Sequence, residues 1–192
     1  MKRIAVLDGS LNGIGGNTYG VIQEAIKELG ALVEVDYIAL KDVSDPLSLH
    51  DRIKAAHGFI VGTGTYWQSW GSPLQRFLEA GTEWEGSNVF LGKPICTIVT
   101  MHSVGGVEVM SRLQSIFNLL GCYAPPHCAM VHSYVNQLAA QVDKEDMEIW
   151  DLRFIPTVAH NFKVALFGSR EFMSWDADQG DIVTGLWFKK PS

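Results

Sequence analysis

The sequence predicts an α/β domain built on a doubly wound, five-stranded parallel sheet flanked by helices. Five short apolar runs recur along the 192 residues, and amphipathic helical patterns separate them. Glycine and proline stand at the boundaries, where helices begin and end. Regular alternation of strand and helix produces a parallel sheet with right-handed crossovers.

Each predicted element follows from local signals. The strands are predicted at residues 4–7, 32–40, 59–61, 94–101 and 128–131, and the helices at 18–29, 45–57, from 72 onward, and 107–120. Gly30 and Gly121 are typical helix C-caps, and Asp45-Pro46 combines an N-cap with a first-turn proline. A last helical region, residues 138–168, is expected to break or kink at Pro156.

The last residues depart from this alternation. Residues 171–175 and 182–188 have the composition of two strands around a turn rich in Asp and Gly, which predicts a C-terminal hairpin-like extension. We therefore divide the chain into a domain over residues 1–168 and a C-terminal tail over 169–192.

Composition narrows the class of protein. Apolar residues make up 47% and charged residues 19%, which is typical of a globular chain, and a net charge of -6 argues against nucleic acid as a partner. An apolar run of about 18 residues is lacking, so no membrane span is expected. Cys96, Cys122 and Cys128 form no CxxC pair, which argues against a disulfide framework or a metal site and favours a cytoplasmic location.

The first functional candidate is the segment over residues 9–18, named here the phosphate loop. It joins a buried strand to a helix, and its glycines allow several backbone amides to converge on one point. Ser10, Asn17 and Thr18 add side-chain donors, and the helix N-terminus favours an anion. The loop ends Gly-Asn-Thr rather than Gly-Lys-Ser/Thr, so it is not a Walker loop. A helix-capping turn without a ligand is the alternative.

Two further loops leave the carboxyl ends of strands at the same sheet edge, where ligands bind in open α/β sheets. The aromatic loop, residues 63–73, holds Tyr66, Trp67 and Trp70, which could flank a planar ring or pack against a neighbour. The glycine loop, residues 101–106, permits close backbone approach to a ligand. Its His102 is a weak candidate for a proton donor, and no residue is identified as certainly catalytic.

These segments, in this order, resemble the NADPH-dependent FMN reductase family, small NAD(P)H-dependent flavin and quinone reductases of the flavodoxin-like fold. The aromatic loop and the helix after it match the family segment without a gap, at Thr63, Tyr66, Ser69, Leu74 and Glu79. Lys93-Pro94 and Gly105-Gly106 also look like the family. The resemblance covers roughly residues 3–132.

The resemblance implies an oxidoreductase that binds FMN, takes electrons from NADPH or NADH, and passes them to a small-molecule acceptor such as a quinone or free flavin. The cofactor-binding residues implied are Ser10, Asn12, Gly16, Asn17 and Thr18 around the phosphate, Thr65, Tyr66, Trp67 and Gln68 along the isoalloxazine, and Ser103, Val104, Gly105 and Gly106 at its far edge. The family also suggests a homodimer or homotetramer.

Among the departures of this chain from the family pattern, two bear on the phosphate. Asn12 stands where the family usually has arginine, and Asp8 directly precedes the phosphate loop, where an ionised carboxylate would repel a phosphate. Two alternatives to the reductase therefore stay open at this point: a one-electron carrier of the flavodoxin type, and a flavin-poor sensor or binding protein.

Overall fold

A computed structural model describes residues 1–135 and 152–168 of the chain. Its five strands are β1 (Lys2–Asp8), β2 (Val33–Ala39), β3 (Phe59–Gly64), β4 (Ile95–Met101) and β5 (Ala129–Ser133). Its α-helices are α1 (Asn17–Leu29), α2 (His50–Ala55), α3 (Ser72–Ala80), α4 (Gly106–Leu120) and α6 (Ile155–Phe167). Short 3₁₀ helices are η1 (Leu40–Asp42), η2 (Pro46–Leu49), η3 (Gly81–Trp84) and η4 (Leu152–Phe154).

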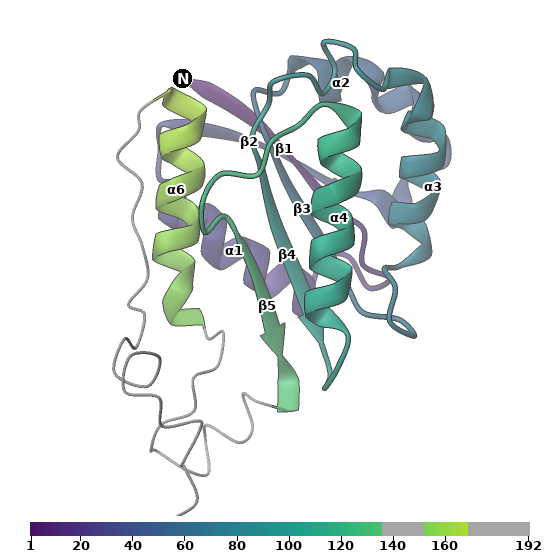
Figure 1. The fold of residues 1–192 in the computed structure, drawn as a ribbon, viewed down its shortest axis with the longest axis vertical. Helices are drawn as coiled ribbons and strands as arrows, with labels where there is room; N and C mark the ends of the chain where they lie inside the picture. Colours follow the sequence, from purple (N-terminus) through teal and green to yellow (C-terminus); the bar gives the residue numbers. More distant parts are fainter. Residues whose placement is uncertain (136–151, 169–192) are drawn as a thin grey trace, which may run out of the picture.

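The five strands form one parallel sheet in the order β2-β1-β3-β4-β5, which confirms the flavodoxin-like, doubly wound prediction. Helices α1 and α6 cover one face of the sheet, and α2, α3 and α4 cover the other (Figure 1). The strand order reverses between β1 and β3, so the connections that leave these strands diverge to opposite faces. A ligand crevice is expected at that edge.

Alternating side chains of the central strands supply two separate cores. In β1, Ile4 and Val6 pack toward α1 and α6, whereas Ala5 and Leu7 pack toward the other helical layer. All four are fully buried. Continuous apolar runs are what a parallel strand covered on both faces requires, and this is why the sequence identified these strands.

Two predicted helices have different boundaries in the structure. The helix expected over residues 45–57 begins as the 3₁₀ helix η2, and α2 follows only from His50. The Asp45 carboxylate accepts a hydrogen bond from Leu47 N, so the predicted N-cap is present. The break expected at Pro156 is present, because η4 ends at Phe154 and α6 begins at Ile155, with the proline in its first turn, where the missing N–H costs nothing.

Two predicted segments lie wholly or partly outside the described residues. The helical region expected from residue 138 is described only from 152, and the C-terminal hairpin over 169–192 lies outside altogether. The boundary between domain and tail at residue 168 stays a prediction. Within the described part of the chain, the helices are too short or too polar to cross a bilayer.

Candidate functional site

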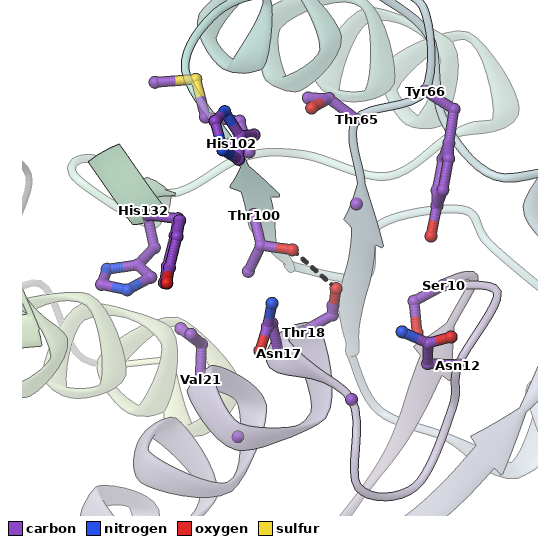
Figure 2. A pocket seen from close by; sticks show the side chains of 15 residues that line it. Ser10, Asn12, Asn17, Thr18, Val21, Thr65, Tyr66, Thr100, His102 and His132 are labelled. Carbon is purple, nitrogen blue, oxygen red and sulfur yellow. Dashed lines mark hydrogen bonds between the residues drawn. The ribbon is translucent and has the colours of Figure 1, made fainter. Parts of the chain in front are cut away.

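A cavity of about 560 Å³ lies at the carboxyl edge of the sheet, at the strand-order reversal. This volume falls within the roughly 300–1,000 Å³ of small-molecule sites. Figure 2 shows Ser10, Asn12 and Tyr66 on one side of it, His102 and His132 on the other, and the hydroxyls of Thr18 and Thr100 between. The lining comprises Ser10, Asn12, Gly16, Asn17, Thr18, Gly20, Val21, Gly64, Thr65, Tyr66, Thr100, Met101, His102, His132 and Tyr134.

The phosphate loop presents backbone amides to this cavity. Gly13 and Gly15 adopt positive φ angles of 61° and 86°, which reverse the chain within a few residues. The first intrahelical bond of α1 runs from Gly20 N to Gly16 O. The N–H groups of residues 17–19 therefore have no hydrogen-bond acceptor within the helix. Together with the helix dipole they can bind an anion.

The Asp8 carboxylate lies outside the lining of the cavity and makes its hydrogen bonds within the protein. The carboxylate is fully buried beneath the loop, where it accepts hydrogen bonds from Ser10 N, at 2.9 Å, and from the hydroxyl of Tyr37. Burial, together with the hydrogen bond to Asp8, raises the pKa of Tyr37, so this hydroxyl stays a donor at neutral pH. One carboxylate oxygen thus accepts a hydrogen bond from the phosphate loop and the other from β2.

A hydroxyl pair joins the phosphate loop to β4. Thr18 Oγ1 and Thr100 Oγ1 lie 2.7 Å apart in a buried contact. Sequence reasoning identified Thr18 but missed Thr100, Gly20, Val21, His132 and Tyr134 of the lining, and it placed Gly64 and Met101 in the ligand-edge loops without naming them as site residues. Five of these residues, Gly64, Thr100, Met101, His132 and Tyr134, stand in the last two positions of β3, β4 and β5 or directly after them. The rule that ligands bind at strand ends could have found them if it had been applied to the last strand residues as well as to the loops.

The aromatic loop is fixed by a tight turn. Tyr66 and Ser69 exchange two backbone hydrogen bonds, of 2.8 and 3.0 Å, which leaves Trp67 and Gln68 at the tip with φ angles of 49° and 60°. Left-handed backbone is unfavourable for non-glycine residues and marks a constrained position. The Tyr66 hydroxyl accepts a hydrogen bond from Leu11 N at 3.2 Å, so this side chain connects the aromatic loop to the phosphate loop.

Not all predicted site residues line the main cavity. Thr65, Tyr66 and His102 do, whereas Trp67 and Gln68 line a second hollow beside α4. Ser103, Val104, Gly105 and Gly106 line neither hollow. The glycine at position 106 is instead required for packing, because a Cβ there would lie 2.3 Å from a side-chain methyl of Val131.

The side chains that line the main cavity carry little formal charge. Among the described residues, its lining contains neither lysine nor arginine, and it includes the imidazoles of His102 and His132. The His102 and Tyr134 rings lie 5.7 Å apart. Asn12 does line the cavity, so the position where the family has arginine offers an amide. The donor set fits the phosphate group of FMN through amides and hydroxyls, and the cavity volume suits its ring.

Comparison with known proteins places the chain by sequence and by fold. The sequence model of NADPH-dependent FMN reductases matches residues 2–137. RosB, solved with a bound 8-demethyl-8-formylriboflavin-5'-phosphate intermediate, has a TM-score of 0.69 at 13% identity and covers 94% of this chain and 92% of its own. FerB from Paracoccus denitrificans, a flavoenzyme NAD(P)H:(acceptor) oxidoreductase, has a TM-score of 0.66 at 20% identity, over 88% and 98% of the two chains.

An NADH:FMN oxidoreductase solved in its apo form has a TM-score of 0.65 at 18% identity and covers 86% of this chain and 90% of its own. At such low identities these solved structures establish the shared fold alone. The comparison with curated proteins gives no match.

Proposed function

This chain belongs to the NADPH-dependent FMN reductase family, and we propose on that premise that the main cavity holds FMN and that the acceptor is a small planar molecule such as a quinone or free flavin. Family membership makes the chain an FMN-dependent NAD(P)H oxidoreductase. The observation that carries the assignment to this cavity is the start of α1, whose amides open onto a hollow at the strand-order reversal.

The proposal divides the cavity between the two ends of the cofactor. Ser10, Gly16, Asn17 and Thr18 hold the phosphate, with Asn12 as a neutral neighbour. The ring lies toward Thr65 and Tyr66, with Trp67, Gln68 and residues 103–106 of the glycine loop at its outer border. The fixed position of Tyr66 supports this division, because its hydroxyl is bonded to Leu11 N.

The chain supplies binding and orientation, while bound FMN supplies the two-electron chemistry between a reduced nicotinamide and an acceptor. The α1 amides favour the phosphate dianion. The Tyr66–Ser69 turn is closed by two backbone hydrogen bonds and borders the ring side, where water must be excluded. His102 lines the cavity and is the candidate proton donor to a reduced acceptor.

The test combines the visible spectrum of the freshly purified protein with anaerobic reduction. We expect bound or reconstituted FMN to lose its visible absorbance within seconds of adding NADH or NADPH. Steady-state kinetics should be ping-pong, with parallel double-reciprocal lines, because nicotinamide and acceptor use the same side of the ring in turn. A protein that binds FMN, but that neither donor reduces over minutes, would be a carrier or a sensor instead.

Two further properties belong to the proposal. A homodimer or homotetramer is supported by exposed large apolar side chains such as Leu91 and Val104, and light scattering at micromolar concentration tests it. A cytoplasmic location is supported by Cys96, Cys122 and Cys128, which are all free, buried thiols, as a reducing compartment maintains them.

A further inference from the structure

The second hollow lies next to the main cavity and shares a turn with it. Its volume is about 610 Å³, and its lining combines the tip of the aromatic loop with the first turns of α4: Trp67, Gln68, Val107, Glu108, Ser111 and Arg112. Thr65 and Tyr66, which directly precede Trp67, line the main cavity. A ligand that occupies both hollows therefore needs only to cross this one turn.

Trp67 is presented to solvent in an unusual way. Its side chain is fully exposed, although tryptophan is normally well buried. The residue is held at the tip of the turn with φ 49°, a conformation that a bulky residue adopts at a free-energy cost. An indole exposed at the tip of this hydrogen-bonded turn offers a flat apolar face on which a planar heterocycle can stack.

Arg112 places a positive charge beside this indole. Its Nη2 donates a hydrogen bond to Gln68 O at 2.5 Å, and its guanidinium lies 5.0 Å from the Trp70 ring centroid. Trp70 is itself held by a 2.8 Å hydrogen bond from its Nε1 to Gln75 Oε1. A guanidinium has several further N–H donors, and one held this firmly loses little entropy when it binds a phosphate.

Glu108 completes the polar part of the hollow. It stands one helical turn before Arg112 and lines the same space. A carboxylate in this position can accept hydrogen bonds from the hydroxyls of a ribose, as acidic residues do in other nucleotide sites. The hollow thus offers a stacking surface, a cation and a hydroxyl acceptor within a few residues.

We propose that the second hollow binds the adenylate half of the reduced nicotinamide dinucleotide, with the adenine on Trp67, the phosphates at Arg112 and the ribose at Glu108. The proposal rests on the proposed function, because the nicotinamide half must reach the flavin in the main cavity. It also assigns Trp67 a role in binding the donor rather than in holding FMN.

The experiment compares NADH with reduced nicotinamide mononucleotide, which carries the same reactive ring and lacks the adenylate. The holoprotein, Trp67→Ala and a matched control, Leu119→Ala, are assayed for the kcat/KM of flavin reduction with each donor. Leu119 is an exposed apolar residue at the other end of α4. The ratio of the two kcat/KM values isolates the adenylate half, because effects of a variant on the flavin or on the fold enter both values.

The wild-type protein should prefer NADH, and Trp67→Ala should reduce that preference about tenfold, the usual effect of losing one base–aromatic stack. Leu119→Ala should keep the wild-type ratio. An unchanged ratio in Trp67→Ala would overturn the adenylate site while leaving the proposed function intact. Dissociation of the oligomer by Trp67→Ala, with the ratio unchanged, would assign the indole to a subunit contact. Failure of both donors to reduce the wild-type flavin would instead refute the proposed function.

Discussion

The phosphate loop and the aromatic loop follow neighbouring strands, β1 and β3, yet their characteristic side chains differ in exposure to solvent. Beneath the phosphate loop, Asp8, Ser10 and Thr18 are buried, and each makes a hydrogen bond within the protein. At the tip of the aromatic loop, Trp67 is fully exposed on a constrained turn. The difference indicates that the phosphate loop binds the cofactor, which stays in place, whereas the tip of the aromatic loop is accessible to the substrates that enter and leave.

Replacing Asp8 should have the largest effect on stability. Asp8→Ala removes the buried acceptor of Ser10 N and the Tyr37 hydroxyl, so we expect the free energy of unfolding to fall by about 2–4 kcal/mol. Urea denaturation of the apo-protein measures this change. Asp8→Asn is the matched control, because it keeps an oxygen for Ser10 N and should lose less. A loss below about 0.5 kcal/mol in Asp8→Ala would show that the loop does not depend on this carboxylate.

The Thr18–Thr100 pair should show an intermediate and non-additive effect. Thr18→Val or Thr100→Val alone leaves the partner hydroxyl buried without its bond and should cost about 1–2 kcal/mol of unfolding free energy. The double variant should cost less than the sum by about 1 kcal/mol, because both hydroxyls are then absent. Strictly additive losses in a double-mutant cycle would mean that the contact carries no coupling.

Ser10→Ala should weaken FMN binding by about 1 kcal/mol, or roughly fivefold in Kd, since its hydroxyl both lines the cavity and accepts a hydrogen bond from Gly13 N at 3.2 Å. Fluorescence titration of apo-protein with FMN measures it. Riboflavin, which lacks the phosphate, is the control ligand, and its Kd should change less. An equal loss for both ligands would place the effect at the ring and not at the phosphate.

The smallest effect on stability is expected from Trp67→Ala. A fully exposed side chain buries no surface within its own chain, so the free energy of unfolding should stay within about 0.5 kcal/mol of the wild type. Thermal or urea denaturation at several protein concentrations checks this. A larger, concentration-dependent loss would show that the indole is buried between subunits, which would remove the contrast between the two loops.

The same contrast explains how far the sequence could be interpreted. The strands and the phosphate loop were predictable because apolar runs, capping residues and clustered glycines are local signals, and the family resemblance pointed to the same segments. The contribution of Thr100, His132 and Tyr134 was not predicted, because residues at the ends of apolar strand runs are first expected in the core, and the register of β4 and β5 decides which of them reach the cavity. The direction of the Asp8 carboxylate and the separation of Trp67 from the main cavity likewise depend on tertiary contacts.

The most direct test of phosphate binding by the phosphate loop is a titration of apo-protein with FMN and, in parallel, with riboflavin. If the α1 amides hold the phosphate, FMN should bind with one-to-one stoichiometry and quench its fluorescence, and its Kd should be at least about tenfold below that of riboflavin. Equal affinity for the two flavins, or no fluorescence change with FMN at high micromolar concentration, would contradict the assignment of the phosphate loop.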